Sequence, residues 1–319
     1  MRKMKALSLA VDIGGTKTAA GLIDVTGKLV ERVELATGQE NAEHTYERVK
    51  IAIDQVLAKA NLQISEVKGL GIGVPGEVDI KQGISLFSPN TPWKNFPIVE
   101  RLTLDYQIPV IMDNDVHMAS FGEWYAAGKN QEDTFLFLTV STGIFVSIIH
   151  KGEVLRGKNA AGEIGHAVFD PGGPRCNCGM QGCLEALASG TGMERAAKRR
   201  YLELNPNTNP TILTMSQIME DYQNGQQYAV ESMEKSLDFL TQGINILLKT
   251  FDPTQLMLGG GVINKNPYLL PIIKEKLQNY LLPIHQTAVE RLILSQLQGD
   301  AGILGAGLRV HFAQECVTP

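Results

Sequence analysis

The sequence has little cysteine, little tryptophan and no long apolar segment. Four cysteines and two tryptophans occur in 319 residues, which excludes a small scaffold held together by many disulfides. The longest apolar stretch, residues 135–149, is interrupted at 141–143 and is too short to span a bilayer. Because the apolar stretch before Asp12 is too short for the core of a signal peptide, we expect a cytoplasmic protein with reduced thiols.

An excess of positive charge, low-complexity segments and repeats of solenoid period are also missing. The net charge is −5 and the pI is near 5.7, which argues against a nucleic-acid-binding surface. Hydrophobic residues make up 44% of the chain and charged residues 20%, as in ordinary globular proteins. The length suffices for two domains, each with its own core.

Three of the four cysteines are concentrated in one short stretch. Cys176, Cys178 and Cys183 follow closely after His166. Three thiolates and one imidazole form the tetrahedral, soft donor set that zinc prefers, and four protein ligands would leave no open position for catalysis. The sequence therefore predicts a structural zinc site. The alternatives are three buried thiols beside an ordinary histidine, or disulfides, for which nothing indicates an oxidising compartment.

Two carboxylates bracket this stretch. Glu163 lies three residues before His166, and Glu185 lies two residues after Cys183. A metal that holds the loop would also fix both carboxylates in space. Rigid acceptors of this kind suit the hydroxyl groups of a small polyhydroxylated ligand.

A glycine-rich turn follows the first apolar run. Residues 7–13 and 19–24 are predicted strands, and the residues between them read Gly-Gly-Thr-Lys from Gly14. Exposed backbone N–H groups, a hydroxyl and a positive charge make this a phosphate cradle by composition, although the spacing of a P-loop is missing. A plain hairpin turn is an equally good interpretation of this segment alone.

Two further segments carry polar residues suited to a ligand. Asn90 lies in a proline-rich loop and offers both a donor and an acceptor, whereas Trp93 nearby is better explained by packing. Asn114 and Asp115 follow a predicted strand at 109–112 and open a helix, a place where α/β proteins bind ligands. Spacing alone favours Asp115 as the helix N-cap.

The second half of the chain repeats the first in outline, with predicted strands at 134–140 and 144–150 around a Ser-Thr-Gly turn. A strand at 254–258 ends in three glycines, which would let a flat ring or ribose approach the backbone, or form a flexible turn. The other predicted elements are strands at 68–74 and 292–295 and helices at 41–61, 116–129, 193–204, 214–223, 226–251, 267–280 and 300–314.

Taken in order, these motifs resemble the ROK family of sugar kinases and related repressors. That family carries Glu-x-Gly-His followed by Cys-x-Cys-Gly-x-x-Gly-Cys-x-Glu, as at 163–166 and 176–185 here. The segments Asp-x-Gly-Gly-Thr from Asp12, Gly-x-Gly-x-Pro-Gly at 71–76 and Asn-Asp at 114–115 also match. The resemblance implies an α/β fold of two actin-like (ribonuclease H-like) domains with a cleft between them. Residues 1–117 would form the first, joined by the C-terminal helix at about 298–319, and residues 118–297 the second.

By this resemblance the protein is an ATP-dependent hexose kinase that acts on a 6-hydroxyl, most simply that of glucose. Asp115 would be the catalytic base, Asp12 would help to hold magnesium, and zinc would be structural, bound by His166 and the three cysteines. A homodimer is also implied. The implied sugar-binding residues are Gly73, Asn90, Asn114, Asp115, Glu163, His166 and Glu185. The implied ATP-binding residues are Asp12, Gly14, Gly15, Thr16, Lys17, Thr142, Gly143, Gly259, Gly260 and Gly261.

Several alternatives stay open. The sugar could be N-acetylmannosamine, N-acetylglucosamine, fructose or a β-glucoside, and the phosphoryl donor could be other than ATP. A repressor of the same family is disfavoured because the phosphate motif begins at Asp12 and leaves no room for a helix-turn-helix before it. A non-catalytic sugar sensor is kept open by Ser141, Phe145, Val146 and Ser147, which replace the small residues usual in the family near the phosphates.

Overall fold

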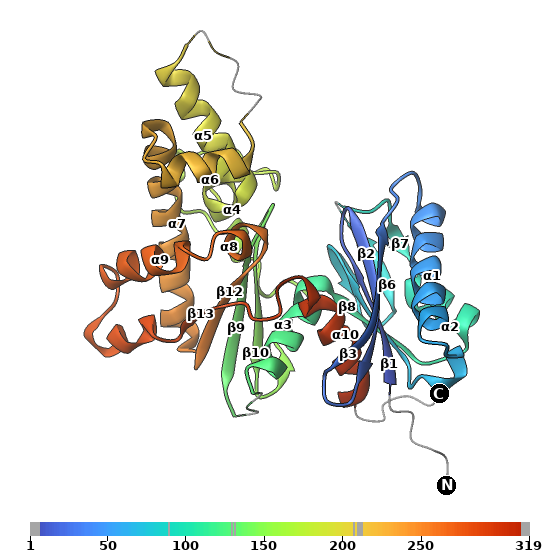
Figure 1. Ribbon diagram of the computed structural model, residues 1–319. Coiled ribbons are helices and arrows are strands. Elements are labelled where there is room, and N and C mark those ends of the chain that lie inside the picture. Colours follow the sequence, from blue (N-terminus) through green and yellow to red (C-terminus); the bar gives the residue numbers. More distant parts are fainter. Residues whose placement is uncertain are drawn as a thin grey trace. The chain divides into compact units, whose positions relative to one another are not determined.

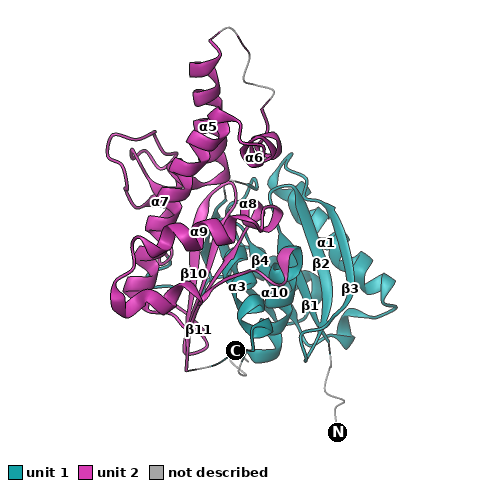
Figure 2. Cartoon of the chain, turned by 60° about the vertical axis from the view of Figure 1, so that its left-hand side comes forward, with its two compact units in different colours: residues 1–130, 156–159, 299–319 teal, residues 131–155, 160–298 magenta. Residues whose placement is uncertain are grey.

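The computed structural model describes residues 7–88, 90–128, 130, 132–206, 208 and 213–313. The chain forms two compact units (Figure 2). Unit 1 comprises residues 1–130, 156–159 and 299–319, and unit 2 comprises residues 131–155 and 160–298. The boundary expected at 117 falls inside a helix that packs on the sheet of unit 1, and unit 1 continues to residue 130.

Unit 1 is built on a five-stranded sheet in the order β3-β2-β1-β4-β8 (Figure 1). The first three strands form an antiparallel meander, whereas β1, β4 and β8 run parallel. The carboxyl ends of these parallel strands therefore meet at one edge, where Asp12 pairs with Gly73 and Gly73 with Asp113. The strands are β1 (Leu7–Ile13), β2 (Lys17–Asp24), β3 (Leu29–Ala36), β4 (Leu70–Val74) and β8 (Val110–Asn114).

Helices cover both faces of this sheet. The helices α1 (Ala42–Lys59) and α2 (Ile98–Tyr106) pack on one face, and α3 (Asp115–Ala126) and α10 (Ala301–Phe312) pack on the other (Figure 1). The α1 helix begins where the side chain of Asn41 accepts a hydrogen bond from the backbone of His44. Close packing of α10 requires glycine in β4, because a Cβ on Gly71 would overlap the carbonyl group of Ala306.

A small three-stranded sheet of β5 (Glu77–Asp79), β6 (Ile84–Phe87) and β7 (Lys94–Phe96) also belongs to unit 1. Sequence reasoning expected only a loop around β7. Trp93 is 1% exposed, stacks on Phe96 with ring centroids 4.9 Å apart, and donates a hydrogen bond to the carbonyl of Ala42. The indole thus packs in the core, as the sequence favoured.

Unit 2 repeats the same plan. Its sheet has the order β11-β10-β9-β12-β13, with an antiparallel meander followed by two parallel strands (Figure 1). This is the order found in unit 1, so the duplication predicted from the two hairpins is present. The strands are β9 (Thr134–Val140), β10 (Ile144–His150), β11 (Glu153–Val154), β12 (Gln255–Gly259) and β13 (Leu292–Leu294).

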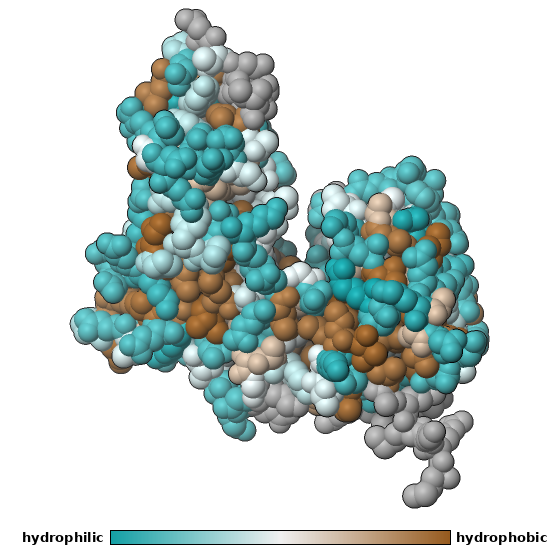
Figure 3. All heavy atoms as spheres, viewed as in Figure 1, coloured by the Kyte–Doolittle hydropathy of each residue, from teal (hydrophilic) through white to brown (hydrophobic). Residues whose placement is uncertain are grey.

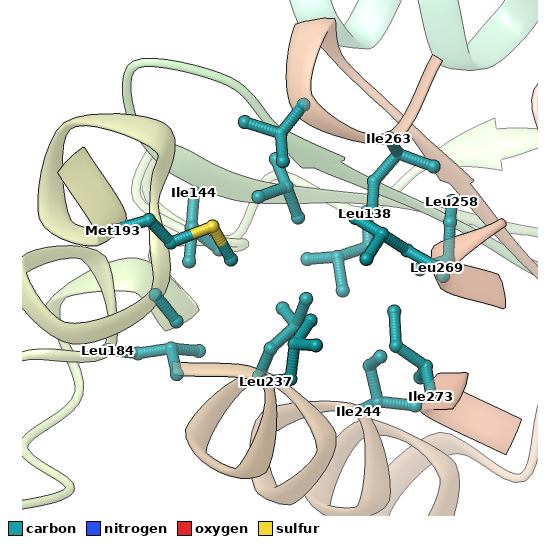
Figure 4. Close-up of a cluster of buried hydrophobic side chains, with 14 of the residues drawn as sticks. Leu138, Ile144, Leu184, Met193, Leu237, Ile244, Leu258, Ile263, Leu269 and Ile273 are labelled. Atoms are coloured by element: carbon teal, nitrogen blue, oxygen red, sulfur yellow. The ribbon is translucent and has the colours of Figure 1, made fainter. Parts of the chain in front are cut away.

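The core of unit 2 lies between this sheet and its helices (Figure 4). Leu138 and Leu258 from the sheet, with Leu237 and Ile244 from α7, are fully or almost fully buried. The helices are α4 (Leu184–Ala188), α5 (Gly190–Leu204), α6 (Met215–Gln223), α7 (Gln227–Phe251), α8 (Gly261–Lys265) and α9 (Leu269–Gln278). Around α5 and α6 the face seen in Figure 3 is mainly hydrophilic. Within the described residues, no helix is both long and apolar enough to cross a membrane.

Candidate active site

Two carboxylates of unit 1 flank a glycine at the carboxyl edge of the sheet. Asp12 lies near the end of β1, and Asp115 is the first residue of α3. A Cβ on Gly73 would lie 3.3 Å from the Cα of Asp115 and 3.3 Å from an Oδ1 of Asp12. A side chain at position 73 would therefore fill the space beside both carboxylates. Gly73 therefore lies beside Asp115, which is also among the sugar-binding residues implied by the family resemblance.

Both carboxyl groups are harder to ionise than an ordinary aspartate. Burial, and to a lesser degree the nearby Asp115, raise the pKa of Asp12 to about 7 against the opposing effect of Arg32. Burial also raises the pKa of Asp115 to about 6, although the backbone N–H of Val116 opposes this. A divalent cation would favour the charged form of both groups.

The oxygens of Asp12 are available to such a cation. Among the described residues, no donor lies within hydrogen-bond distance of the Asp12 carboxylate. Hard cations such as magnesium take carboxylate oxygen as a ligand. The Asp12 side chain therefore fits the role of a magnesium ligand that the resemblance gave it.

Asn114, rather than Asp115, caps α3. Its Oδ1 accepts a hydrogen bond from the backbone of Val116 at 2.9 Å, and its Nδ2 donates to the carbonyl of Gly76 at 3.0 Å. The cap predicted from spacing at Asp115 is thus displaced by one residue. Asn114 fixes the start of the helix and with it the position of Asp115, and its amide keeps one N–H for a ligand.

A buried ion pair that the sequence did not reveal lies behind this turn. The guanidinium of Arg156 contacts the carboxylate of Asp113, and their side chains are 17% and 5% exposed. The same carboxylate accepts a hydrogen bond from the backbone of Asn114 at 2.9 Å. His117 is buried nearby, and burial lowers its pKa to about 4, so it is neutral at pH 7. The pair holds the backbone that carries Asn114 and Asp115.

The glycine turn lies beside Asn90. A Cβ on Gly15 would be 3.1 Å from the Cβ of Asn90. Gln39, which sequence reasoning missed, donates its amide to the carbonyl of Gly15 and, at 2.9 Å, to that of Asn90. The predicted phosphate turn and the predicted sugar loop are therefore tied together by one side chain. Pro89, which the sequence grouped with Asn90, lies outside the described residues.

The two polar residues of the turn are exposed. The backbone N–H of Gly14 donates to the carbonyl of Lys17 at 2.8 Å, which closes the hairpin. The ammonium of Lys17 lies 2.5 Å from a carboxylate oxygen of Glu34, and Thr16 faces solvent. Lys17 is paired in this arrangement, so contact with a phosphate would require it to leave Glu34.

In unit 2 the predicted zinc ligands come together. The donor atoms of His166, Cys176, Cys178 and Cys183 all lie within 4.8 Å of one another. The sulfurs of Cys178 and Cys183 are 3.6 Å apart, and Nδ1 of His166 is 3.6 Å from the sulfur of Cys176. Tetrahedral zinc with Zn–S bonds of about 2.3 Å separates its ligand atoms by roughly 3.5–3.8 Å. The donor set fits a structural zinc ion.

The sugar-binding candidates of unit 2 surround this set. Nε2 of His166 lies 3.8 Å from a carboxylate oxygen of Glu163, on the ring edge opposite the cysteines. Glu185 lies in α4, and its Oε2 accepts a hydrogen bond from the backbone of Ile144 at 3.2 Å. A Cβ on Gly143 would come within 2.5 Å of that oxygen. Gly143 thus makes room for the carboxylate of Glu185.

A cavity of about 480 Å³ in unit 2 contains part of the predicted nucleotide set. Thr142 and Gly261 line it, together with Met215 and Met219 of α6, which the sequence did not indicate. Cavities of this size hold small ligands, and apolar side chains suit a flat ring. Gly143 is not in its lining.

Only one of the three consecutive glycines reaches the cavity. Gly259 packs against the ring of Phe137, and Gly260, at φ +87°, packs against the carbonyl of Val140. These two glycines allow close packing at the end of β12, whereas Gly261 faces the cavity.

Phe145, which departs from the family pattern, does not line this cavity either. A Cβ on Gly162 would lie 2.8 Å from the ring of Phe145, so the ring packs against the segment that leads to Glu163. The doubt that Phe145 raised about the approach of a nucleotide therefore finds no support in the geometry of unit 2.

Comparisons with known proteins identify the family to which this chain belongs. A family model described as the ROK family matches residues 8–312. The chain belongs to the ROK family. It is similar to a glucokinase of Thermotoga maritima, with 32% identity over 96% of this chain and 97% of the relative. It is also similar to an N-acetylmannosamine kinase of Escherichia coli, with 31% identity over 94% and 97%.

Among solved structures, the chain is similar to a ROK family glucokinase of Streptomyces griseus in complex with glucose and AMPPNP. The TM-score is 0.78 and the identity 30%, covering 94% of this chain and 98% of that chain. The predicted family and the predicted fold class are thus confirmed.

Proposed function

We propose that this ROK protein is an ATP-dependent hexose kinase that phosphorylates the 6-hydroxyl of a sugar, with glucose as the preferred substrate. The observation that carries the proposal is the arrangement of Asp12, Gly73 and Asp115 at one sheet edge. The similarity to glucokinases, with 32% and 30% identity over nearly the whole chain, supports glucose.

Asp115 acts as the general base. A pKa of about 6 leaves the carboxylate mostly ionised at pH 7 and still basic enough to accept a proton. The sugar oxygen forms a bond to the γ-phosphorus as its proton passes to Asp115. The bond from this phosphorus to the bridging oxygen breaks, and ADP leaves. Most of the catalytic effect comes from positioning and charge stabilisation.

The remaining sugar contacts come from both units. Asn90, Asn114 and the open space at Gly73 serve in unit 1. Glu163, His166 and Glu185 serve in unit 2, where structural zinc bound by His166 and the three cysteines holds their loop in place. The edge of His166 that carries Nε2 faces Glu163 rather than the cysteines, and this supports a second role of the ring toward a sugar hydroxyl.

ATP is held by the turns of both hairpins. Asp12 is the proposed magnesium ligand, and the ion, when bound, neutralises charge on the phosphates. The backbone of Gly14 and Gly15, with Thr16 and Lys17, contacts phosphate. In unit 2, Thr142 and Gly261 line the cavity that we assign to the nucleoside. The family resemblance adds a homodimer to the proposal, and the short apolar stretch before Asp12 adds a cytoplasmic location.

N-acetylmannosamine is the main alternative substrate, because a kinase for this sugar is 31% identical over most of the chain. The two sugars differ at carbon 2, where the N-acetyl group adds bulk and removes a hydroxyl donor. A site built to bond a hydroxyl rejects an analogue that lacks it. The ratio of kcat/KM for the two sugars decides between them.

The position of transfer is tested with glucose and 6-deoxyglucose, followed by phosphorus and proton NMR of the products. We expect glucose 6-phosphate from glucose, and from 6-deoxyglucose no phosphorylated product, although it competes with glucose. Phosphorylation of 6-deoxyglucose, or ADP formation at the same rate without sugar, would overturn the proposal.

A further inference from the structure

Unit 2 contains a second, larger cavity of about 620 Å³. Its walls are the zinc-binding loop at 170–174 and helices α4, α5 and α7. It shares no lining residue with the cavity assigned to the nucleoside, and Glu163, His166 and Glu185 do not line it. Nothing in the proposed reaction uses this cavity, although its volume is typical of sites for small molecules.

The wall of the cavity contains a hydroxyl without a partner. Ser236 is 2% exposed and, among the described residues, its hydroxyl forms no hydrogen bond. Two neighbours on the same helix behave differently: Ser232 donates to the carbonyl of Tyr228 at 2.8 Å, and Thr241 donates to that of Leu237 at 2.7 Å. The Ser236 oxygen itself is not fully buried, so it is open to the cavity, where water or a ligand can bond it.

The cavity is lined by four basic and three acidic residues, so it carries an excess of one positive charge. Arg200 is paired with Glu203 and Glu231. Arg195 and Lys235, in contrast, form no ion pair with any described carboxylate, and the guanidinium of Arg195 donates only to the carbonyl of Arg175. Both side chains are exposed and can turn toward a ligand. Arginine and lysine are the residues that bind phosphate and carboxylate groups.

We propose that this cavity binds a small metabolite that carries a phosphate or carboxylate group. Arg195 and Lys235 bind the oxyanion, and the hydroxyl of Ser236 bonds a polar group on the body of the ligand. Leu187 and Phe239, which also line the cavity, pack against its carbon atoms. The site is distinct from the positions assigned to sugar and nucleotide.

Occupancy of this site affects the sugar-binding residues through α4. Ala186 and Leu187 of this helix line the cavity, and Glu185 precedes them directly. The lining also includes Asp170, whose backbone N–H bonds the carbonyl of Gly182 beside the proposed zinc ligand Cys183. A ligand that contacts both walls stabilises the arrangement that holds Glu185, so it lowers the KM for sugar. This effect rests on the proposed hexose kinase function, whereas binding itself does not.

The test is calorimetric titration of the zinc-loaded full-length protein with glycerol 3-phosphate and, separately, with citrate. Glucose and a non-hydrolysable ATP analogue are present at saturation, so that neither probe enters the active site. We expect saturable binding of at least one probe. The variant Arg195→Ala/Lys235→Ala should weaken it by about tenfold or more, and Ser236→Ala by a smaller factor.

The matched control is Lys249→Ala/Lys274→Ala, which removes the same charge from α7 and α9 at positions that line neither cavity. Its affinity for the probe should equal that of the unchanged protein. Failure of both probes to bind up to roughly 10 mM, or equal weakening in the two double variants, would overturn the proposal. A protein that binds a probe but phosphorylates no sugar would refute the proposed function and leave this site standing.

Discussion

The two units share one sheet order but differ in the side chains at corresponding strand ends. In unit 1, Asp12 occupies the next-to-last position of β1 and pairs with Gly73 of the parallel strand. In unit 2, Thr139 occupies the next-to-last position of β9 and pairs with Gly259. The corresponding position of the strand pair thus holds a carboxylate in unit 1 and a neutral hydroxyl in unit 2. Glycine is the partner in both units for different reasons: a side chain at Gly73 would fill the space beside the two carboxylates, whereas one at Gly259 would overlap the ring of Phe137.

The segments inserted after the strands differ as well. Unit 1 adds the small sheet of β5, β6 and β7, which positions Asn90, whereas unit 2 adds the loop that brings His166 and the three cysteines together, which positions Glu163 and Glu185. The comparison shows that the residues that determine the sheet order are not the residues that determine the chemistry of each unit. Buried apolar strands fix the fold in both units, and a few residues at the strand ends give unit 1 the carboxylates to which we assign the proton transfer and the magnesium ion.

The largest effect is expected from removing the base in unit 1. Asp115→Asn should lower kcat by about a thousandfold or more, because general bases contribute factors of roughly 10²–10⁴. Sugar affinity, measured by calorimetry, should change little. The comparison variant in unit 2 changes the residue that corresponds to Asp12: Thr139→Val should leave kcat within about a factor of three. An equal loss of kcat in the two variants would show that the catalytic groups are not confined to unit 1.

Breaking the ion pair behind Asp115 should cost stability. Arg156→Ala leaves the carboxylate of Asp113 buried without its partner, and such changes cost about 3–5 kcal/mol. We expect a clear drop in the thermal midpoint and a lower kcat. The double variant Arg156→Ala/Asp113→Asn should recover part of the loss, because no unpaired charge remains. If the double variant is no more stable than Arg156→Ala, the pair does not hold this turn.

Replacing a proposed zinc ligand should weaken sugar binding, because the loop in unit 2 would no longer hold Glu163 and Glu185 in place. Cys178→Ser is expected to release zinc, measured by metal analysis, and to weaken sugar affinity by roughly tenfold or more. Met180→Ala, at an exposed position of the same loop, is the control and should keep both. Tight sugar binding by the metal-free variant would show that the loop does not shape the sugar site.

Activity and stability should respond to pH in opposite directions. Since Asp115 must be ionised, kcat/KM should rise about tenfold per pH unit below a pKa near 6 and level off above it. The folded-state pKa values of Asp12 and Asp115 lie above the ordinary value, so the folded protein binds protons more tightly than the unfolded chain. Their contribution to stability is therefore complete below pH 4 and is lost between about pH 4 and pH 7.

This pH dependence is checked with rate profiles and with thermal midpoints measured without magnesium. The control for stability is Asp12→Asn, which should flatten the loss between pH 4 and pH 7. A rate profile without an ascending limb between pH 5 and pH 7 would contradict the assignment of Asp115.

The smallest effect is expected at Phe145 of unit 2. Its ring packs against Gly162 and does not line the cavity assigned to the nucleoside. Phe145→Ala should therefore leave the KM for ATP within about a factor of two while it lowers stability through lost packing. An improved KM for ATP would show that the ring crowds the phosphates after all.

The sequence predicted the long elements and the local motifs well. Residues 7–13 and 134–140 are apolar runs that form strands, and the stripe along 227–251 forms a helix, because burial dominates there. The clustering of His166 with Cys176, Cys178 and Cys183 was also predictable, since the four residues lie close together in the chain. Several elements escaped. Among them are β3, which has no buried residue and carries Glu31, Arg32 and Glu34, and α2, which begins directly after a proline.

The site residues that escaped are those whose partners are far apart in the sequence. Arg156 meets Asp113 across 43 residues, and Gln39 meets Asn90 across 51. Met215 and Met219 line a cavity only because α6 folds back beside Thr142. No local pattern marks such contacts. Conversely, three consecutive glycines suggested three ligand contacts, and packing at the strand end explains two of them.

The most direct test of the account is ADP release from magnesium-ATP with glucose, N-acetylmannosamine, N-acetylglucosamine, fructose and cellobiose, each assayed with the unchanged protein and with Asp115→Asn. We predict one strongly preferred sugar, glucose, and loss of that activity in the variant. Silence across all five sugars, with sugar still bound in calorimetry, would contradict the assignment and indicate a protein that senses sugar without phosphorylating it.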